Sequence, residues 1–157
     1  MLLSYFLMFI SFILLILNGA QGYFQFYIYN AGHIQFAFLA TIFYMFSESW
    51  IMFYFIGSGK TIKETIISHS FDKNLYSEVI ASKKKVFPHI TLNILLIGSV
   101  FVIGGGVHTK VISSAFHGWL FIFSMIHYLY VIRLQHLAFK DTVGMLSKLG
   151  KLIEGEK

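Results

Sequence analysis

Four apolar stretches occupy most of this 157-residue chain and restrict its fold more than any other feature. They cover residues 2–18, 33–57, 87–107 and 112–139. A helix crosses the hydrocarbon of a bilayer with about 20 apolar residues, and it satisfies its own backbone hydrogen bonds there. Since 57% of all residues are hydrophobic, we expect an all-α integral membrane protein. Its four transmembrane helices are expected to form one antiparallel bundle, a single membrane domain over residues 1–157.

The first stretch also allows a second interpretation, that of a secretory signal peptide. Small and polar residues follow it, NGAQG at 18–22, as they do at a signal-peptide cleavage site. A signal peptide begins with basic residues, however, and no lysine or arginine precedes Lys60. We therefore expect the first stretch to remain in the protein as a helix.

Basic residues are distributed unevenly over the connections between the stretches. Residues 58–86 contain six lysines and residues 140–157 contain four, whereas residues 19–32 contain none and residues 108–111 contain one. Cytoplasmic connections of membrane proteins carry the excess of lysine and arginine. The sequence thus predicts a multi-pass protein of the cell (inner) membrane with both termini in the cytoplasm.

The long connection, residues 58–86, mixes charged and apolar residues. We expect a cytoplasmic loop in which the second helix continues briefly and a short amphipathic helix lies on the membrane surface. Proline is tolerated in the first turn of a helix, so we expect the third helix to begin at Pro88. Residues 140–157 are expected to form a cytoplasmic tail.

Composition and motifs exclude several classes of function. The chain has no cysteine, which excludes disulfides, thiolate metal sites, iron–sulfur clusters and covalently attached haem. The net charge of +5 does not indicate nucleic-acid binding, because the basic residues lie almost wholly outside the apolar stretches. The segment GSGKT at 57–61 ends like a phosphate-binding loop, but Tyr54 stands where that loop has its first glycine. The segment also follows a membrane helix rather than a strand, so we expect no nucleotide site.

Histidines in the apolar stretches are the most unusual polar residues of the chain. Ionisable side chains inside a membrane are costly, and by default they face the interior of a bundle. At about 100° and 1.5 Å per residue, His33 and His117 lie on inward faces within a turn of the outer surface. His108 lies at the outer end of the third helix. We expect these three histidines to form an outer layer.

A second, inner layer of polar side chains is predicted roughly 15 to 22 Å deeper. Its members are Glu48, His89, Asn93 and His127. His136 lies near the cytoplasmic end beside Arg133, where it is expected to join a basic rim. His69 lies in the polar connection and is expected to be solvated.

The outer layer supports two kinds of chemistry. Two imidazoles that face each other across a bundle are the ligands that a b-type haem requires, and His33 with His117 is the preferred pair. His108 is the substitute for either. The same three residues are candidates for binding a single copper, zinc or iron ion, because three imidazoles with one open position make a reactive metal site. Spacing in the sequence does not decide between haem and a bare ion.

The inner layer allows three roles. It is a candidate for a second cofactor, such as another haem held by His89 with His127 or His136. It is also a candidate for a quinone headgroup site, and for a proton relay that includes Glu48. A structural hydrogen bond is the alternative to all three.

Together these features predict a small electron-transfer subunit that holds b-type haem within the lipid bilayer. Because the chain has no sizeable domain outside the bilayer, we expect it not to be a complete enzyme. It is expected instead to be a subunit of a membrane oxidoreductase, in contact with other membrane protein subunits. Two alternatives remain: a structural accessory subunit without cofactor, and a metal-handling membrane protein that uses the three outer histidines.

Overall fold

The computed structural model describes residues 1–155 and folds them into four α-helices. The helices are α1 (Leu2–Phe24), α2 (His33–Ser68), α3 (Asn74–His108) and α4 (Ser114–Gly155). Within these residues there is no strand, and the only β-type contact is an isolated bridge between Ile28 and Ala31. All four helices are long and apolar enough to cross a membrane. The prediction of an all-helical chain with four such helices is confirmed.

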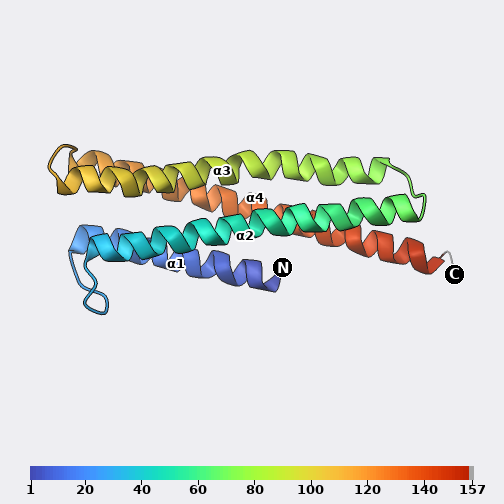
Figure 1. Cartoon of the computed structure of the whole chain (residues 1–157), viewed down its shortest axis with the longest axis horizontal. Helices are drawn as coiled ribbons and strands as arrows, with labels where there is room; N and C mark the ends of the chain where they lie inside the picture. Colours follow the sequence, from blue (N-terminus) through green and yellow to red (C-terminus); the bar gives the residue numbers. More distant parts are fainter. Residues whose placement is uncertain (156–157) are drawn as a thin grey trace.

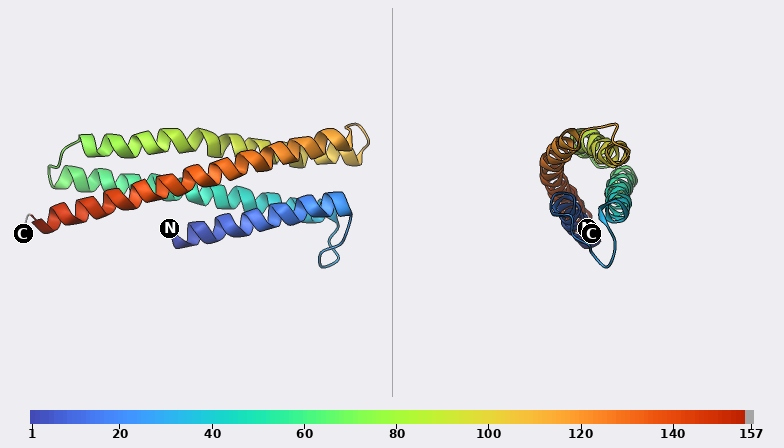
Figure 2. Two further views of the ribbon diagram at one scale, coloured as in Figure 1. Left: turned by 180° about the vertical axis from the view of Figure 1, so that it is seen from behind. Right: turned by 90° about the vertical axis from the view of Figure 1, so that its left-hand side faces the viewer.

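The chain reverses direction at each of its three connections, so consecutive helices lie side by side (Figure 1). Helix α1 packs along α2, and α3 packs along α4, while α2 also contacts both α3 and α4. Figure 2 shows the same helices from behind and end-on, with the start of α1 about midway along the bundle. Helix α1 is therefore a partner for only one half of α2, and we call that end of the molecule the four-helix half.

Three of the helices are longer than a bilayer requires. Helices α2, α3 and α4 have 36, 35 and 42 residues, which is about 52 to 63 Å of helix at the usual rise. The hydrocarbon of a bilayer is about 30 Å thick. The surplus lies at one end of the molecule (Figure 1), and we call this end the stem. It comprises residues 57–68 of α2, 74–86 of α3 and 140–155 of α4.

The structure describes all of residues 58–86, and the short amphipathic surface helix predicted there is not observed. They form no separate surface helix, but continue α2 and begin α3 around a short turn at 69–73. Their apolar side chains pack on α4 in a core of their own. This core consists of Ile62, Ile66, Val79, Met145 and Leu149. The amphipathic pattern is thus buried against other helices rather than on a membrane surface.

Two further helix boundaries differ from those predicted. Helix α3 begins at Asn74, so Pro88 lies inside the helix. The prediction that Pro88 lies in the first turn of this helix is therefore wrong. The expected tail continues α4 as far as Gly155. The last two residues of that tail, 156–157, lie outside the described residues.

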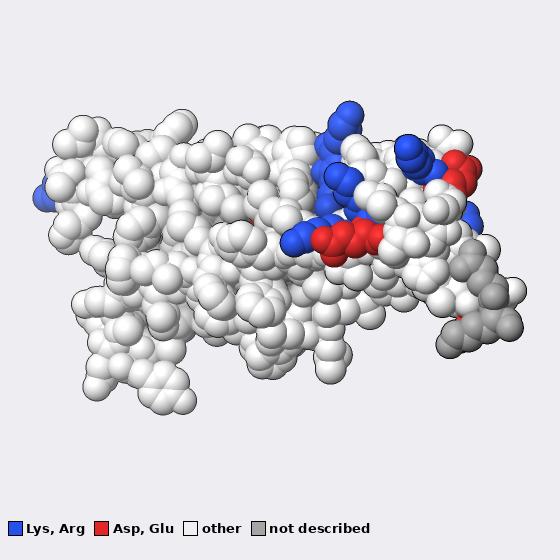
Figure 3. Space-filling model, turned by 45° about the vertical axis from the view of Figure 1, so that its right-hand side comes forward, with Lys and Arg blue, Asp and Glu red and all other residues white. Residues whose placement is uncertain are grey.

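The surface of the four-helix half is apolar. Leu2, Phe9 and Phe53 are 84, 61 and 69% exposed. On the face shown in Figure 3, most of the lysine, arginine, aspartate and glutamate gathers at the end that carries the stem, blue is also visible at the opposite end, and the part between them is nearly free of charged side chains. Large apolar side chains that face outward over the length of a bundle are compatible with lipid as the surrounding solvent.

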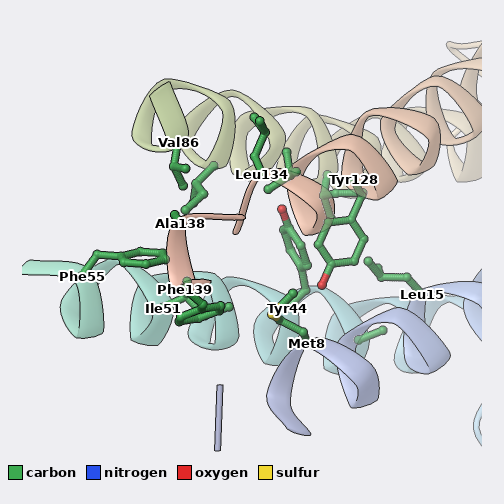
Figure 4. Packing of buried hydrophobic residues seen from close by; sticks show 14 of the residues in the cluster. Met8, Leu15, Tyr44, Ile51, Phe55, Val86, Tyr128, Leu134, Ala138 and Phe139 are labelled. Carbon is green, nitrogen blue, oxygen red and sulfur yellow. The ribbon is translucent and has the colours of Figure 1, made fainter. Parts of the chain in front are cut away.

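Two fully buried tyrosines form the centre of the main core. The rings of Tyr44 and Tyr128 meet edge to face, with centroids 5.0 Å apart. Their hydroxyl groups point in opposite directions (Figure 4). Leu15 of α1 packs on the same cluster. Toward the stem, the rings of Phe55 and Phe139 stack at 4.8 Å. The core thus contains residues of all four helices, and the hydroxyl oxygens of Tyr44 and Tyr128 lie inside it.

Candidate functional site

His33 and His117 lie opposite each other at the end of the four-helix half away from the stem. His33 is the first residue of α2, and His117 lies in the first turn of α4. Their ring centroids are 6.4 Å apart and the ring planes are inclined at 73°. Both side chains are half-buried. The Nδ1 atom of each ring is buried and has no hydrogen-bond partner among the described residues.

Each of these rings packs against a glycine of a neighbouring helix. A Cβ atom at Gly22 of α1 would lie 3.0 Å from Cε1 of His33. A Cβ atom at Gly104 of α3 would lie 3.2 Å from Cε1 of His117. These distances are shorter than ordinary van der Waals contact, so a larger residue at either position would displace the ring. Glycine thus allows the backbones of α1 and α3 to approach the two rings closely.

The centroid distance of the two rings is near the value expected for two imidazoles on one metal ion, while their Nε2 atoms lie beside the glycines, 3.4 Å from a Cβ at Gly22 for His33 and 3.7 Å from a Cβ at Gly104 for His117. A metal–imidazole bond is about 2.0–2.1 Å long, and a ring nitrogen lies about 1.1 Å from the ring centroid. Two such rings in line have centroids roughly 6.3 Å apart, close to the observed 6.4 Å. Two protein ligands suffice for a haem iron, because the macrocycle occupies the other positions. A bare zinc or copper ion takes more ligands.

His108 does not join this pair in a metal site. It is the last residue of α3 and is exposed. No group of three or more histidine, cysteine, aspartate or glutamate side chains converges anywhere in residues 1–155. The site of three imidazoles predicted from His33, His108 and His117 is therefore not formed, because α3 ends with His108 at its exposed tip.

Three residues of the predicted inner layer do meet, through hydrogen bonds that cross α2, α3 and α4. The Tyr44 hydroxyl donates to Asn93 Oδ1 at 2.6 Å. Asn93 Nδ2 lies 3.0 Å from the backbone carbonyl of Ser124 and 3.1 Å from His127 Nδ1. His127 Nε2 lies 3.4 Å from His89 Nδ1. The chain of contacts thus leads from the buried Tyr44 to the half-buried His89.

The donor and acceptor roles in this network follow from the side-chain amide of Asn93. Asn93 Nδ2 can only donate, so His127 Nδ1 accepts and its Nε2 carries the proton. That proton is donated to His89 Nδ1. In this arrangement the two rings bond to each other directly. The 3.4 Å between the two nitrogens is shorter than the roughly 4 Å between two imidazole nitrogens in line on one metal ion, so the observed arrangement is a hydrogen-bonded chain.

Glu48, the remaining member of the predicted inner layer, has a different partner. It is completely buried, and its Oε2 accepts a hydrogen bond from Nε2 of Gln135 on α4. Its Oε1 has no partner among the described residues. The one salt bridge in residues 1–155 joins Lys60 and Glu64 in the stem, so Glu48 has no basic partner there.

Sequence reasoning missed a row of buried polar side chains on α1. Ser4, Ser11, Asn18 and Gln21 are all buried. The first three recur at intervals of seven residues, which places them on one face of a helix. This spacing is visible in the sequence and predicts an inward polar face on α1 as well as on the other helices.

The remaining two histidines lie apart from both groups. His136 is exposed, and its Nδ1 lies 2.8 Å from the hydroxyl of Tyr5, so it contacts α1. His69 is exposed in the turn of the stem and stacks on Phe71.

The chain matches no protein-family model, and neither the curated proteins nor the solved structures give a match. Function is therefore argued from the geometry of the site.

Proposed function

We propose that this chain is a membrane-embedded electron-transfer subunit that holds one b-type haem between His33 and His117. The observation that carries the proposal is the 6.4 Å separation of the two rings on facing helices. The unpartnered Nδ1 atoms and the close glycines on α1 and α3 support it. A haem held by these two residues would supply one-electron transfer.

The residues around the proposed haem have distinct roles. His33 and His117 would hold the iron through their imidazoles. The backbone of Asn18 lies beside the His33 ring and that of Val100 beside the His117 ring, where they would help to orient the two imidazoles. The apolar and aromatic side chains of the four-helix half exclude water. Exclusion of water and of charge tunes the reduction potential of a haem.

The proposed setting is the cell (inner) membrane, with an antiparallel bundle and both termini in the cytoplasm. Ten of the twelve lysines and arginines lie at positions 58–86 or 140–157, on the cytoplasmic side of this arrangement. A one-electron carrier needs a donor and an acceptor. We therefore place the chain in a larger membrane oxidoreductase, beside other membrane protein subunits.

An optical spectrum of the purified protein tests the proposal. We expect a Soret band and, on reduction, an α-band. The variants His33→Ala and His117→Ala remove one axial ligand each, and each will lose most of the haem absorbance per protein. The matched controls His69→Ala and His108→Ala remove exposed histidines outside the pair and will keep it.

Two results would contradict the proposal. A folded preparation that is colourless and gives no pyridine haemochrome would favour a structural accessory subunit. Equal haem content in all four variants would show that haem is bound elsewhere.

A further inference from the structure

Buried polar atoms without partners are concentrated in one interface of this molecule. Among the described residues, such atoms occur on α1, α2 and α4, and none lies on α3. Those of α1 are Ser4 Oγ, Ser11 Oγ, Asn18 Oδ1 and Gln21 Oε1. Near the middle of the bundle, α2 and α4 add Ser47 Oγ, Glu48 Oε1, Tyr128 OH and Gln135 Oε1. Unsatisfied buried polar atoms are rare in folded proteins, so this concentration calls for an explanation.

The atoms on α1 extend along most of the membrane depth. From Ser4 to Gln21 the helix rises about 25 Å, compared with a hydrocarbon thickness of about 30 Å. Ser11 is near the middle of the row. It faces the hydroxyl of Tyr128, which also faces Glu48. The row on α1 and the buried carboxyl group therefore meet at one place.

Glu48 is surrounded by neutral groups. Gln135 donates to one of its oxygens, and the other oxygen has no partner among the described residues. The titratable groups that face it are the phenols of Tyr44 and Tyr128. An ionised carboxylate without a cation is very unfavourable in a low-dielectric interior, whereas the neutral acid is not. The surroundings of Glu48 therefore favour its protonated form.

Water is the ligand that fits the unpartnered atoms. A buried water molecule typically makes about three hydrogen bonds to otherwise unsatisfied polar groups. Serine hydroxyls and amide oxygens spaced along one helix face offer such partners at successive depths. We propose that Glu48 carries an exchangeable proton, and that water along the Ser4–Ser11 row connects it to the level at which α1 begins, about midway along the molecule. In the exchange, a hydronium ion gives its proton to the carboxylate and remains as water, and the reverse step releases it.

This assignment stands apart from the proposed haem. The row meets Glu48 about 22 Å along α2 from His33, and its argument uses neither ring. A colourless protein would leave it unaffected.

Infrared spectroscopy of the purified protein at neutral pH tests the protonation of Glu48. The wild type will show a carboxylic acid C=O band that shifts in D₂O, and Glu48→Gln will lack it. The matched control Glu64→Gln removes an exposed carboxylate of the stem and will keep the band. If Glu48→Gln fails to fold, ¹³C-glutamate labelling of the wild type identifies a protonated glutamate, because Glu48 is the one buried glutamate among the described residues.

The rate of deuterium exchange tests the row. In Ser11→Val the acid band will remain but its shift in D₂O will be several-fold slower, whereas Ser77→Val on the exposed face of the stem will exchange like the wild type. Loss of a carboxylate band instead of an acid band in Glu48→Gln would overturn the proposal. So would a carboxyl signal that responds to sodium chloride in place of pH, which would identify a metal cation at Glu48. Unchanged exchange in Ser11→Val would show that the row is not the path.

Discussion

Gly104 has no side chain, and this leaves room for the His117 ring beside the backbone of α3. A Cβ atom there would lie 3.2 Å from Cε1 of His117, whereas a Cβ atom at Gly105 would meet nothing within 4 Å. The two adjacent glycines thus differ in what they touch while sharing a helix and a conformation. They offer a matched pair for testing whether the position of the His117 ring matters.

We expect Gly104→Val to reduce the haem absorbance per folded protein several-fold, because the valine side chain displaces the His117 ring. Gly105→Val introduces the same β-branched residue into the same turn and will keep the absorbance near that of the wild type. The measurement is the Soret absorbance divided by protein concentration, with helix content checked by circular dichroism. An equal loss in both variants would attribute the effect to the helix and not to the ring.

At the residue scale, the sequence predicts the direction in which a side chain points better than it predicts the residue that the side chain contacts. His33 and His117 were expected to face the bundle interior near one surface, and the structure places their rings opposite each other. Helical geometry sets the direction of a side chain, so this much follows from spacing. The partner of Glu48 did not follow, because Gln135 lies on another helix. The relative position of two helices along their axes depends on packing, which the spacing within one helix does not contain.

At the scale of the helices, hydropathy predicted four of them but not their full length. Residues 58–86 have the periodicity of an amphipathic helix, and this pattern is satisfied equally by a membrane surface or by the side of another helix. The structure favours the second, because α4 continues to Gly155 and supplies Met145 and Leu149 as partners. The sequence of the connection alone does not reveal that partner.

Two neighbouring isoleucines of the stem distinguish its core from its surface. Ile66 is 2% exposed and Ile67 is 62% exposed. We expect Ile66→Asp to open the stem, because an unpaired charge in its small core is strongly unfavourable. Limited proteolysis will then cut the turn at 69–73 much faster than in the wild type.

The control for this prediction is Ile67→Asp, which places the same charge on the surface and will leave the cleavage rate near that of the wild type. The haem absorbance of Ile66→Asp is expected to persist, since the His33–His117 pair lies at the opposite end of α2 and α4. Equal cleavage of both variants would contradict the packing of α2 against the rest of the stem.

At the scale of the whole molecule, the proposed orientation depends on where the charge lies. The chain has no native cysteine, so single cysteines report their own location. Tyr29 lies exposed in the α1–α2 connection, and Ser70 lies exposed in the turn of the stem. In the proposed orientation, one crossing of the membrane by α2 separates them.

We expect a membrane-impermeant maleimide to label Tyr29→Cys in intact cells. Ser70→Cys will be labelled only after the membrane is permeabilised, because the lysine-rich stem stays in the cytoplasm. The cysteine-free wild type is the control. The opposite pattern would invert the orientation, and labelling of both variants from the same side would contradict a membrane crossing by α2.

The pairing of His33 with His117 also sets an order of assembly. The two residues lie at the beginnings of α2 and α4, and synthesis delivers the chain from the N-terminus. His33, Gly22 and Gly104 are therefore synthesised before His117. Under the proposed function, haem would be held by both histidines only after the beginning of α4 has been synthesised.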